Sequence, residues 1–218
     1  MATSLLLPRI FASCIAAIAI VFALAAGTAL HAAEAPVILV VGDSISAGYG
    51  LSSGEGWVDL LASKVTSEGY PYRVVNASIS GDTTAGGRAR LAGLLKQHRP
   101  AIVIIELGAN DALRGGNLAA TRANLDAMVA AAQAAGAKVL IVGMQLPPNY
   151  GAAYGREFGA LFGDVAKARK TAVVPYAFEG FGEDLAQFQP DRVHPTAAAQ
   201  RRILANVWPA LSALLQRK

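Results

Sequence analysis

Residues 37–50 read Val-Ile-Leu-Val-Val-Gly-Asp-Ser-Ile-Ser-Ala-Gly-Tyr-Gly, and this stretch decides the fold. Its first five residues are apolar and mostly β-branched, which is typical of a parallel strand buried on both faces. The run stops at Gly42 and is followed at once by Asp43 and Ser44. Because ligands of open α/β sheets bind at the carboxyl ends of the strands, Ser44 is a candidate nucleophile.

Strands and helices are expected to alternate along the rest of the chain. Apolar runs predict further strands at about 72–77, 101–107, 138–144 and 172–176. Helical spacing predicts helices at about 57–68, from after residue 84 to 97, 118–135, from after residue 151 to 170, and from just after Pro195 to Gln216, the last interrupted or kinked at Pro209. This alternation favours a flavodoxin-like three-layer α/β/α sandwich with a five-stranded parallel sheet in the order 2-1-3-4-5.

The amino-terminal segment has the features of a signal peptide. One positive charge at Arg9 precedes a long apolar stretch, residues 11–30, and small residues follow at Ala32, Ala33 and Ala35. We therefore expect a signal peptide at residues 1–35, a single domain at 36–218, and a periplasmic or secreted protein. The alternative is that the apolar stretch stays uncleaved as a membrane anchor.

Composition argues against several classes of function. The net charge is +4, and the basic residues are scattered rather than clustered as in a nucleic-acid-binding face. The single cysteine lies in the signal segment, so disulfide or thiol chemistry is not expected. Neither metal-ligand spacing nor a nucleotide-binding glycine motif occurs. We expect a monomer that acts on a small molecule, without metal or cofactor.

Polar residues follow four of the expected strands. Ser44 follows the first strand, Gly81 the second and Asn110 the third, while Asp191 and His194 follow the fifth. Because parallel strands end at the same edge of the sheet, these residues are expected to converge there.

Acyl transfer needs this set of chemical groups. Ser44 suits the nucleophile, His194 the general base, and Asp191, three residues earlier, the group that orients the imidazole. The backbone N–H groups of Ser44 and Gly81 and the side-chain amide of Asn110 suit an oxyanion hole.

Five other polar residues near these positions are expected to be structural. Asp43 is expected to bind loop amides and Asp111 to cap a helix, as are Asp82 and Thr83. Glu106 lies in an otherwise apolar strand, where a buried carboxylate requires a hydrogen-bond partner in a neighbouring loop.

Four sequence blocks resemble those of the SGNH (GDSL) hydrolases. They are G-D-S-I-S-A-G-Y-G at 42–50, N-A-S-I-S-G-D-T at 76–83, E-L-G-A-N-D at 106–111 and D-R-V-H-P at 191–195. L-P-P-N-Y-G at 146–151 extends the likeness to the secreted thioesterase I, lysophospholipase and arylesterase subgroup. The four letters of the name fall on Ser44, Gly81, Asn110 and His194. Two departures are Ala109 and Arg192, where relatives often have a glycine and a small residue.

The resemblance implies a serine esterase that hydrolyses carboxylic esters and thioesters through an acyl-enzyme, with Asp191 as the third member of the triad. The loop that holds Pro147, Asn149 and Tyr150 is expected to bind substrate, and it and residues 178–188 are expected to wall an acyl pocket. The alternatives are a carbohydrate O-acetyl esterase on the same scaffold and a periplasmic binding module without catalysis.

Overall fold

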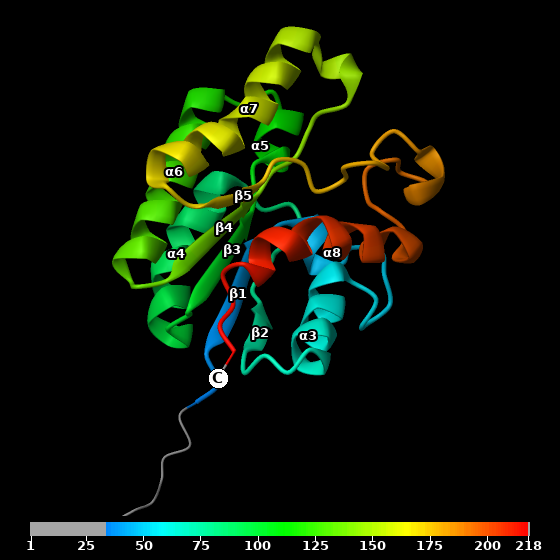
Figure 1. The fold of residues 1–218 in the computed structure, drawn as a ribbon. Helices are drawn as coiled ribbons and strands as arrows, with labels where there is room; N and C mark the ends of the chain where they lie inside the picture. The colour runs from blue at the N-terminus through cyan, green and yellow to red at the C-terminus, as the bar shows by residue number, and fades with distance from the viewer. Residues whose placement is uncertain (1–33, 218) are drawn as a thin grey trace, which may run out of the picture. The chain divides into compact units, whose positions relative to one another are not determined.

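The computed structural model describes residues 34–217, so all but the last two residues of the predicted signal peptide, 1–35, lie outside the described range. The unit from Ala35 onward contains one sheet of five parallel strands in the order β2-β1-β3-β4-β5 (Figure 1). The predicted fold class and strand order are therefore confirmed. The strands are β1 Val37–Gly42, β2 Arg73–Asn76, β3 Ile102–Glu106, β4 Lys138–Val142 and β5 Ala172–Val174.

Helices cover both faces of the sheet. Helices α3 and α8 lie together on one face, and α4, α6 and α7 lie on the other (Figure 1). The α-helices are α2 Ser44–Ala47, α3 Trp57–Ser67, α4 Thr84–His98, α5 Ala109–Leu113, α6 Leu118–Ala134, α7 Ala152–Arg169 and α8 Ala197–Ser212. Two 3-10 helices, η1 Pro148–Tyr150 and η2 Leu185–Gln187, lie in the connections.

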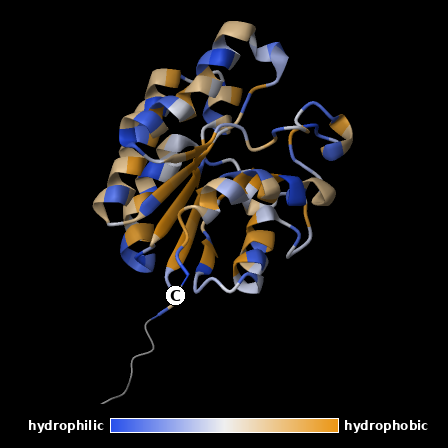
Figure 2. Cartoon of the chain, in the orientation of Figure 1, coloured by the Kyte–Doolittle hydropathy of each residue, from blue (hydrophilic) through white to orange (hydrophobic). Residues whose placement is uncertain are grey.

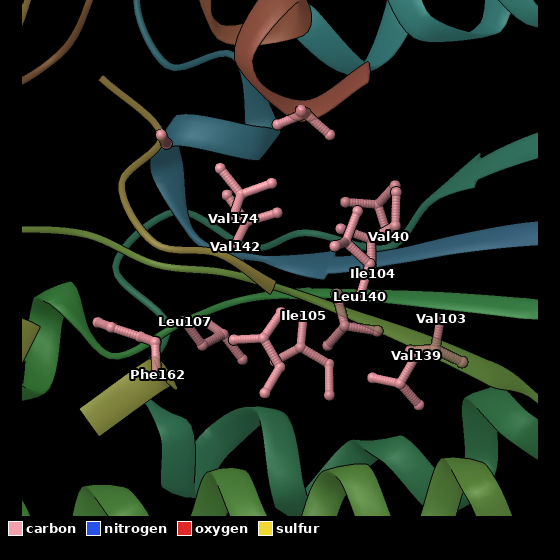
Figure 3. Packing of buried hydrophobic residues seen from close by; sticks show 14 of the residues in the cluster. Val40, Val103, Ile104, Ile105, Leu107, Val139, Leu140, Val142, Phe162 and Val174 are labelled. Carbon is pink, nitrogen blue, oxygen red and sulfur yellow. The ribbon is translucent and has the colours of Figure 1, made fainter. Parts of the chain in front are cut away.

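The core lies on both faces of β1, β3 and β4, which are the most hydrophobic parts of the ribbon (Figure 2). All six residues of β1 are buried. Successive side chains of β3 point to opposite faces, so Ile104 packs beside Leu140 on one face and Val103 beside Val139 on the other (Figure 3). This double burial explains why β1, β3 and β4 read as nearly continuous apolar runs.

Helix α8 differs from its prediction. It runs through Pro209 without interruption and ends at Ser212, before the expected end at about Gln216. Proline removes one backbone hydrogen bond there, whereas Val207 and Leu211 on either side of it are fully buried. Packing of this face against the sheet therefore carries the helix past the proline. Within residues 34–217, no helix has both the length and the apolar character needed to cross a membrane.

Candidate active site

Ser44 lies where β1 turns into the single-turn helix α2. Asp43 caps this helix, because its Oδ1 accepts a hydrogen bond of 3.0 Å from the N–H of Ile45. Gly48 ends the helix with a φ of 74°, a left-handed conformation that glycine adopts readily. The turn holds the half-buried Ser44 at the carboxyl edge of the sheet.

Ser44, His194 and Asp191 form a continuous chain of hydrogen bonds. His194 Nε2 lies 2.8 Å from Ser44 Oγ, and His194 Nδ1 lies 2.7 Å from Asp191 Oδ2. An aspartate that accepts a hydrogen bond from Nδ1–H leaves Nε2 free to accept one from a hydroxyl. The geometry therefore suits proton transfer from Ser44 to His194.

The carboxylate of Asp191 is held in its charged form. Partial burial raises its pKa, but hydrogen bonds from the backbone N–H groups of His194 and Val193 and from the His194 ring outweigh this effect. The net result lowers the pKa of Asp191 to about 2. Asp191 is consequently ionised at neutral pH, as an imidazole-orienting group must be.

The loop that carries these two residues is a closed turn. The N–H of Gln189 donates to the carbonyl of His194 at 2.7 Å, and the N–H of Arg192 donates to the carbonyl of Gln189 at 2.8 Å. Arg192 has a φ of 59°, in the left-handed region. That conformation costs a residue with a side chain roughly 1–2 kcal/mol.

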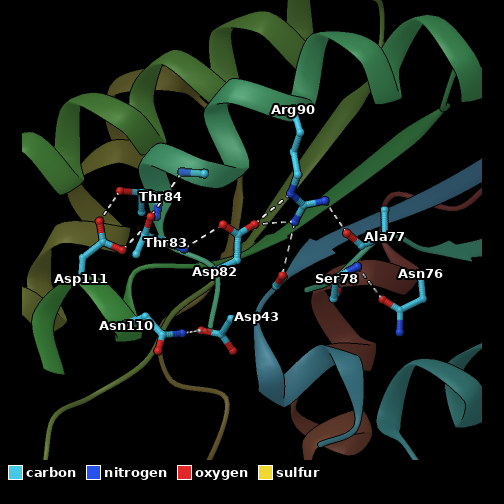
Figure 4. A network of polar contacts seen from close by, with 12 residues as sticks. Asp43, Asn76, Ala77, Ser78, Asp82, Thr83, Thr84, Arg90, Asn110 and Asp111 are labelled. Atoms are coloured by element: carbon cyan, nitrogen blue, oxygen red, sulfur yellow. Dashed lines mark hydrogen bonds and ion pairs between the residues drawn. The ribbon is translucent and has the colours of Figure 1, made fainter. Parts of the chain in front are cut away.

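The three groups expected in the oxyanion hole differ in their surroundings. In the described part of the chain, neither the N–H of Ser44 nor that of Gly81 donates a hydrogen bond. The carbonyl of Gly81 accepts one of 3.1 Å from Arg114. Asn110 Nδ2 donates to Asp43 Oδ2 at 3.1 Å (Figure 4), which engages one of the two amide hydrogens and leaves the other available.

Two buried carboxylates lie behind this edge of the sheet. Asp43 and Glu106 are each only 1% exposed. Glu106 Oε2 accepts a hydrogen bond of 2.7 Å from Ser46, so the expected partner exists but lies in helix α2 rather than in a loop, while Oε1 has no partner among residues 34–217. Burial raises the pKa of Asp43 to about 6. Burial, and then the charge of Asp43, raise the pKa of Glu106 well above its usual value.

The predicted caps of α4 are only partly correct. Thr83 caps the helix by accepting from the N–H of Gly86 at 3.2 Å, as expected. Asp82 instead pairs with Arg90, whose guanidinium also donates to the carbonyl of residue 77 (Figure 4). Asp111 accepts hydrogen bonds from both the N–H and the hydroxyl of Thr84, so it fastens the start of α4 from a neighbouring helix.

The loop expected to bind substrate lies around η1. Pro147 and Asn149 are exposed, and the half-buried Tyr150 donates its hydroxyl hydrogen to the carbonyl of Leu113 at 3.2 Å. Among the described residues, no hydrogen bond joins the side chains of this loop to Ser44 or His194.

Residues 178–188, the other expected wall of the acyl pocket, contribute mainly to the hydrophobic core. Phe178 and Phe181 are buried and pack against each other and against Phe188. The prediction of a pocket wall is therefore wrong for these two rings. They pack within the connection that leads to the Asp191–His194 turn, where aromatic pairs add to the free energy gained by burial.

Sequence reasoning missed Tyr49 as a neighbour of the site. Its ring centroid lies 4.5 Å from that of His194, and its side chain is 53% exposed. Ile79 and Val193, two other exposed large apolar residues, also lie on the loops that carry Gly81 and His194. The signal in the sequence was an aromatic residue between two glycines, five positions after the candidate nucleophile.

Comparison with known proteins agrees with this geometry. A profile described as the GDSL-like Lipase/Acylhydrolase family matches residues 40–202. The "Esterase TesA" of Pseudomonas aeruginosa is 55% identical over 183 residues, which are 84% of this chain and 91% of that protein. The "Thioesterase 1/protease 1/lysophospholipase L1" of Escherichia coli K12 is 41% identical over 170 residues, 78% of this chain and 80% of that protein.

Solved structures are similar as well. A crystal structure of TesA has a TM-score of 0.81 and 55% identity, and the match covers 82% of this chain and 99% of that one. The family match at residues 40–202 spans all four sequence blocks, at 42–50, 76–83, 106–111 and 191–195. The chain therefore belongs to the GDSL-like lipase/acylhydrolase family, the SGNH hydrolases.

Proposed function

We propose that this protein is a serine hydrolase that cleaves carboxylic esters and thioesters through an acyl-enzyme. The observation that carries the proposal is the hydrogen-bonded chain from Ser44 Oγ through His194 to Asp191, with distances of 2.8 and 2.7 Å. Membership of the family and the names of the esterase and thioesterase relatives support the same chemistry.

In the proposed reaction, Ser44 Oγ attacks the acyl carbonyl and His194 Nε2 takes its proton. The N–H groups of Ser44 and Gly81 and the amide of Asn110 stabilise the oxyanion. Collapse of the tetrahedral intermediate expels the alcohol or thiol, which receives the proton from His194. Water then attacks the acyl-enzyme, with His194 again as base, and releases the acid.

The surroundings of the site favour substrates with an apolar acyl group. Tyr49, Ile79 and Val193 expose apolar surface on the loops next to the candidate triad. Pro147, Asn149 and Tyr150 supply a further rim in this proposal. Because the amino-terminal sequence resembles a signal peptide, we propose that the enzyme is a periplasmic or secreted monomer and meets esters or lysophospholipids rather than acyl-CoA.

Hydrolysis of p-nitrophenyl butyrate by the purified protein tests the proposal. We expect Ser44→Ala to lower turnover by a factor on the order of 10⁴ or more, because the nucleophile is lost. Ser63→Ala is the matched control, since its hydroxyl only bonds a carbonyl on the surface of α3. Normal turnover by Ser44→Ala would contradict the assignment.

A panel of substrates then defines the acyl preference. Esters and thioesters of graded chain length, together with acetylated sugars, separate the proposed activity from the carbohydrate alternative. Activity confined to acetyl groups on sugars would overturn the proposed substrate class while leaving Ser44 as nucleophile. Failure of a fluorophosphonate to label the protein would instead support the binding-module alternative.

A further inference from the structure

One side chain joins the loop that carries the proposed base to the turn that follows the proposed nucleophile. Gln189 Nε2 donates to the carbonyl of Tyr49 at 2.8 Å and to the carbonyl of Pro195 at 3.1 Å. The backbone N–H of the same residue donates to the carbonyl of His194 at 2.7 Å. Gln189 therefore bonds to His194 and to the residue after it on one side, and to Tyr49, five residues after Ser44, on the other.

The fit between Gln189 and the opposite turn depends on a glycine. A Cβ atom at Gly50 would lie 2.1 Å from Gln189 Oε1, so the amide rests directly on the Gly50 backbone. Gly50 also has a φ of 73°, which favours glycine for a second reason. The residue before Gly50 makes a further contact between the two loops, because the Tyr49 ring packs against the His194 ring.

The carbonyl of Pro195 also accepts a hydrogen bond from a second glutamine. Gln200 Nε2 donates to the carbonyl of Pro195 at 3.3 Å, and its Oε1 accepts from the N–H of Trp57 at 3.1 Å. Gln200 is fully buried and Gln189 is half-buried. The carbonyl of the residue after His194 is thus held by two glutamines. Gln189 donates from the same Nε2 to Tyr49, and Gln200 accepts through its Oε1 from Trp57.

We infer that Gln189 is a positioning residue that keeps His194 at hydrogen-bonding distance from Ser44. The inference rests on the proposed function, because it concerns the alignment of the same nucleophile and base. The turn that carries His194 is closed by its own hydrogen bonds. The Gln189 amide and the ring of Tyr49 join it to the segment that follows α2, whereas Gln200 joins Pro195 to Trp57 at the start of α3. An imidazole displaced by a fraction of an ångström transfers the proton poorly without binding substrate less well.

Gln189→Met tests this role, because methionine keeps the volume and loses both donors. Gln187→Met is the matched control: Gln187 Nε2 donates only to Asp184, the residue that caps η2, at 3.2 Å. We expect Gln189→Met to lower kcat for p-nitrophenyl butyrate by about 10- to 100-fold with KM changed less than about twofold. The rate of inactivation by diisopropyl fluorophosphate is expected to fall in parallel, whereas Gln187→Met changes neither.

Gln189→Glu tests whether the hydrogen bonds that the side chain donates matter, or only its size and shape. A glutamate keeps the size and polarity of the side chain and cannot donate to two carbonyls when ionised, so it is expected to be impaired like Gln189→Met. Normal kcat in Gln189→Glu, or kcat and inactivation rates in Gln189→Met within twofold of the control, would overturn the proposal.

Hydrogen exchange gives a readout that does not depend on catalysis. The amides of residues 191–194 and 196 are expected to exchange faster in Gln189→Met than in Gln187→Met, because the turn is less tightly held. Unchanged exchange would also overturn the positioning role. If the unsubstituted protein neither hydrolyses esters nor reacts with the fluorophosphate, the proposed function fails, whereas the exchange measurement still decides whether Gln189 fastens the turn.

Discussion

The amide of Asn110 owes its orientation to one buried acceptor, Asp43 Oδ2. We expect Asn110→Ala to lower turnover by about 10²–10³-fold, the usual loss of one oxyanion donor. Asp43→Ala leaves the amide present and free to rotate, so we expect a smaller loss of about 10-fold with little change in KM. In the double variant the loss should equal that of Asn110→Ala alone, because the two residues act through one donor. Steady-state kinetics on p-nitrophenyl butyrate measures all three.

Asp43→Ala also removes the cap of α2, and the resulting loss of stability could lower turnover by itself. Asn117→Ala is the control, since Asn117 caps α6 by accepting from two backbone N–H groups away from the site. Each cap is worth about 0.5–2 kcal/mol of stability, so urea unfolding of the two variants should differ little. Losses that multiply in the double variant would show that Asp43 acts independently of Asn110.

Replacement of Asp191 tests whether its carboxylate orients the His194 imidazole. Asparagine in its place keeps the shape but presents an amide that no longer stabilises the imidazolium or fixes the Nδ1–H tautomer. We expect Asp191→Asn to lower kcat by up to about 10⁴-fold, the loss that the same change causes in serine-protease triads. A loss of less than about tenfold would contradict the role of Asp191.

At the scale of elements, glycines mark the points where strands and helices approach most closely. A Cβ atom at Gly143, just after β4, would lie 2.4 Å from the carbonyl oxygen of Pro175 and 3.0 Å from the ring of Phe162. We therefore expect Gly143→Ala to lower the free energy of unfolding by about 1–3 kcal/mol. Gly93, on the exposed side of α4, has open space at this position, and Gly93→Ala should raise it by about 0.5–1 kcal/mol. Opposite signs in urea unfolding test the pair, and a stabilising Gly143→Ala would contradict the close approach.

The sequence predicted the elements whose pattern reflects burial and missed those that are too short to show a pattern. All five strands were located within about two residues. In β1, β3 and β4 the apolar run is continuous because both faces are covered, whereas the shorter β2 and β5 are only partly buried. Helix α5, which holds Asn110 and has only five residues, was not predicted, since it spans little more than one turn. The extent of α8 past Pro209 depends on packing against the sheet, which no local signal contains.

For the whole molecule, topology explains why the candidate site was predictable. Parallel strands bring their carboxyl ends to one edge, so Ser44 and His194 meet although 150 residues separate them. Gln189 was not predicted, because its contact with Tyr49 depends on how two loops from opposite ends of the domain pack together. Side chains that perform chemistry can be recognised by type, whereas side chains that hold loops in place resemble any other polar residue.

Glu106 links the site to the stability of the whole domain. Burial, and then the charge of Asp43, raise the pKa of Glu106 well above its usual value, so the native state binds a proton that the unfolded chain has released. Its contribution to stability is complete below about pH 4.5, the ordinary glutamate value, and declines as the pH rises towards the raised pKa. Asp191 acts in the opposite sense, because its pKa is lowered to about 2 and its contribution declines as the pH falls below 3.8.

Glu106→Gln is expected to remove the first of these two dependences. Glutamine keeps an oxygen that can accept from Ser46 and stays neutral at every pH, so the urea midpoint of the variant should exceed that of the unsubstituted protein by an amount that grows between pH 5 and 8. Each unit by which the pKa differs between the folded and unfolded chain corresponds to about 1.4 kcal/mol. Urea unfolding at several pH values measures the difference. Parallel pH profiles for the two proteins would show that Glu106 does not retain a proton in the folded state and that the buried pair carries two negative charges.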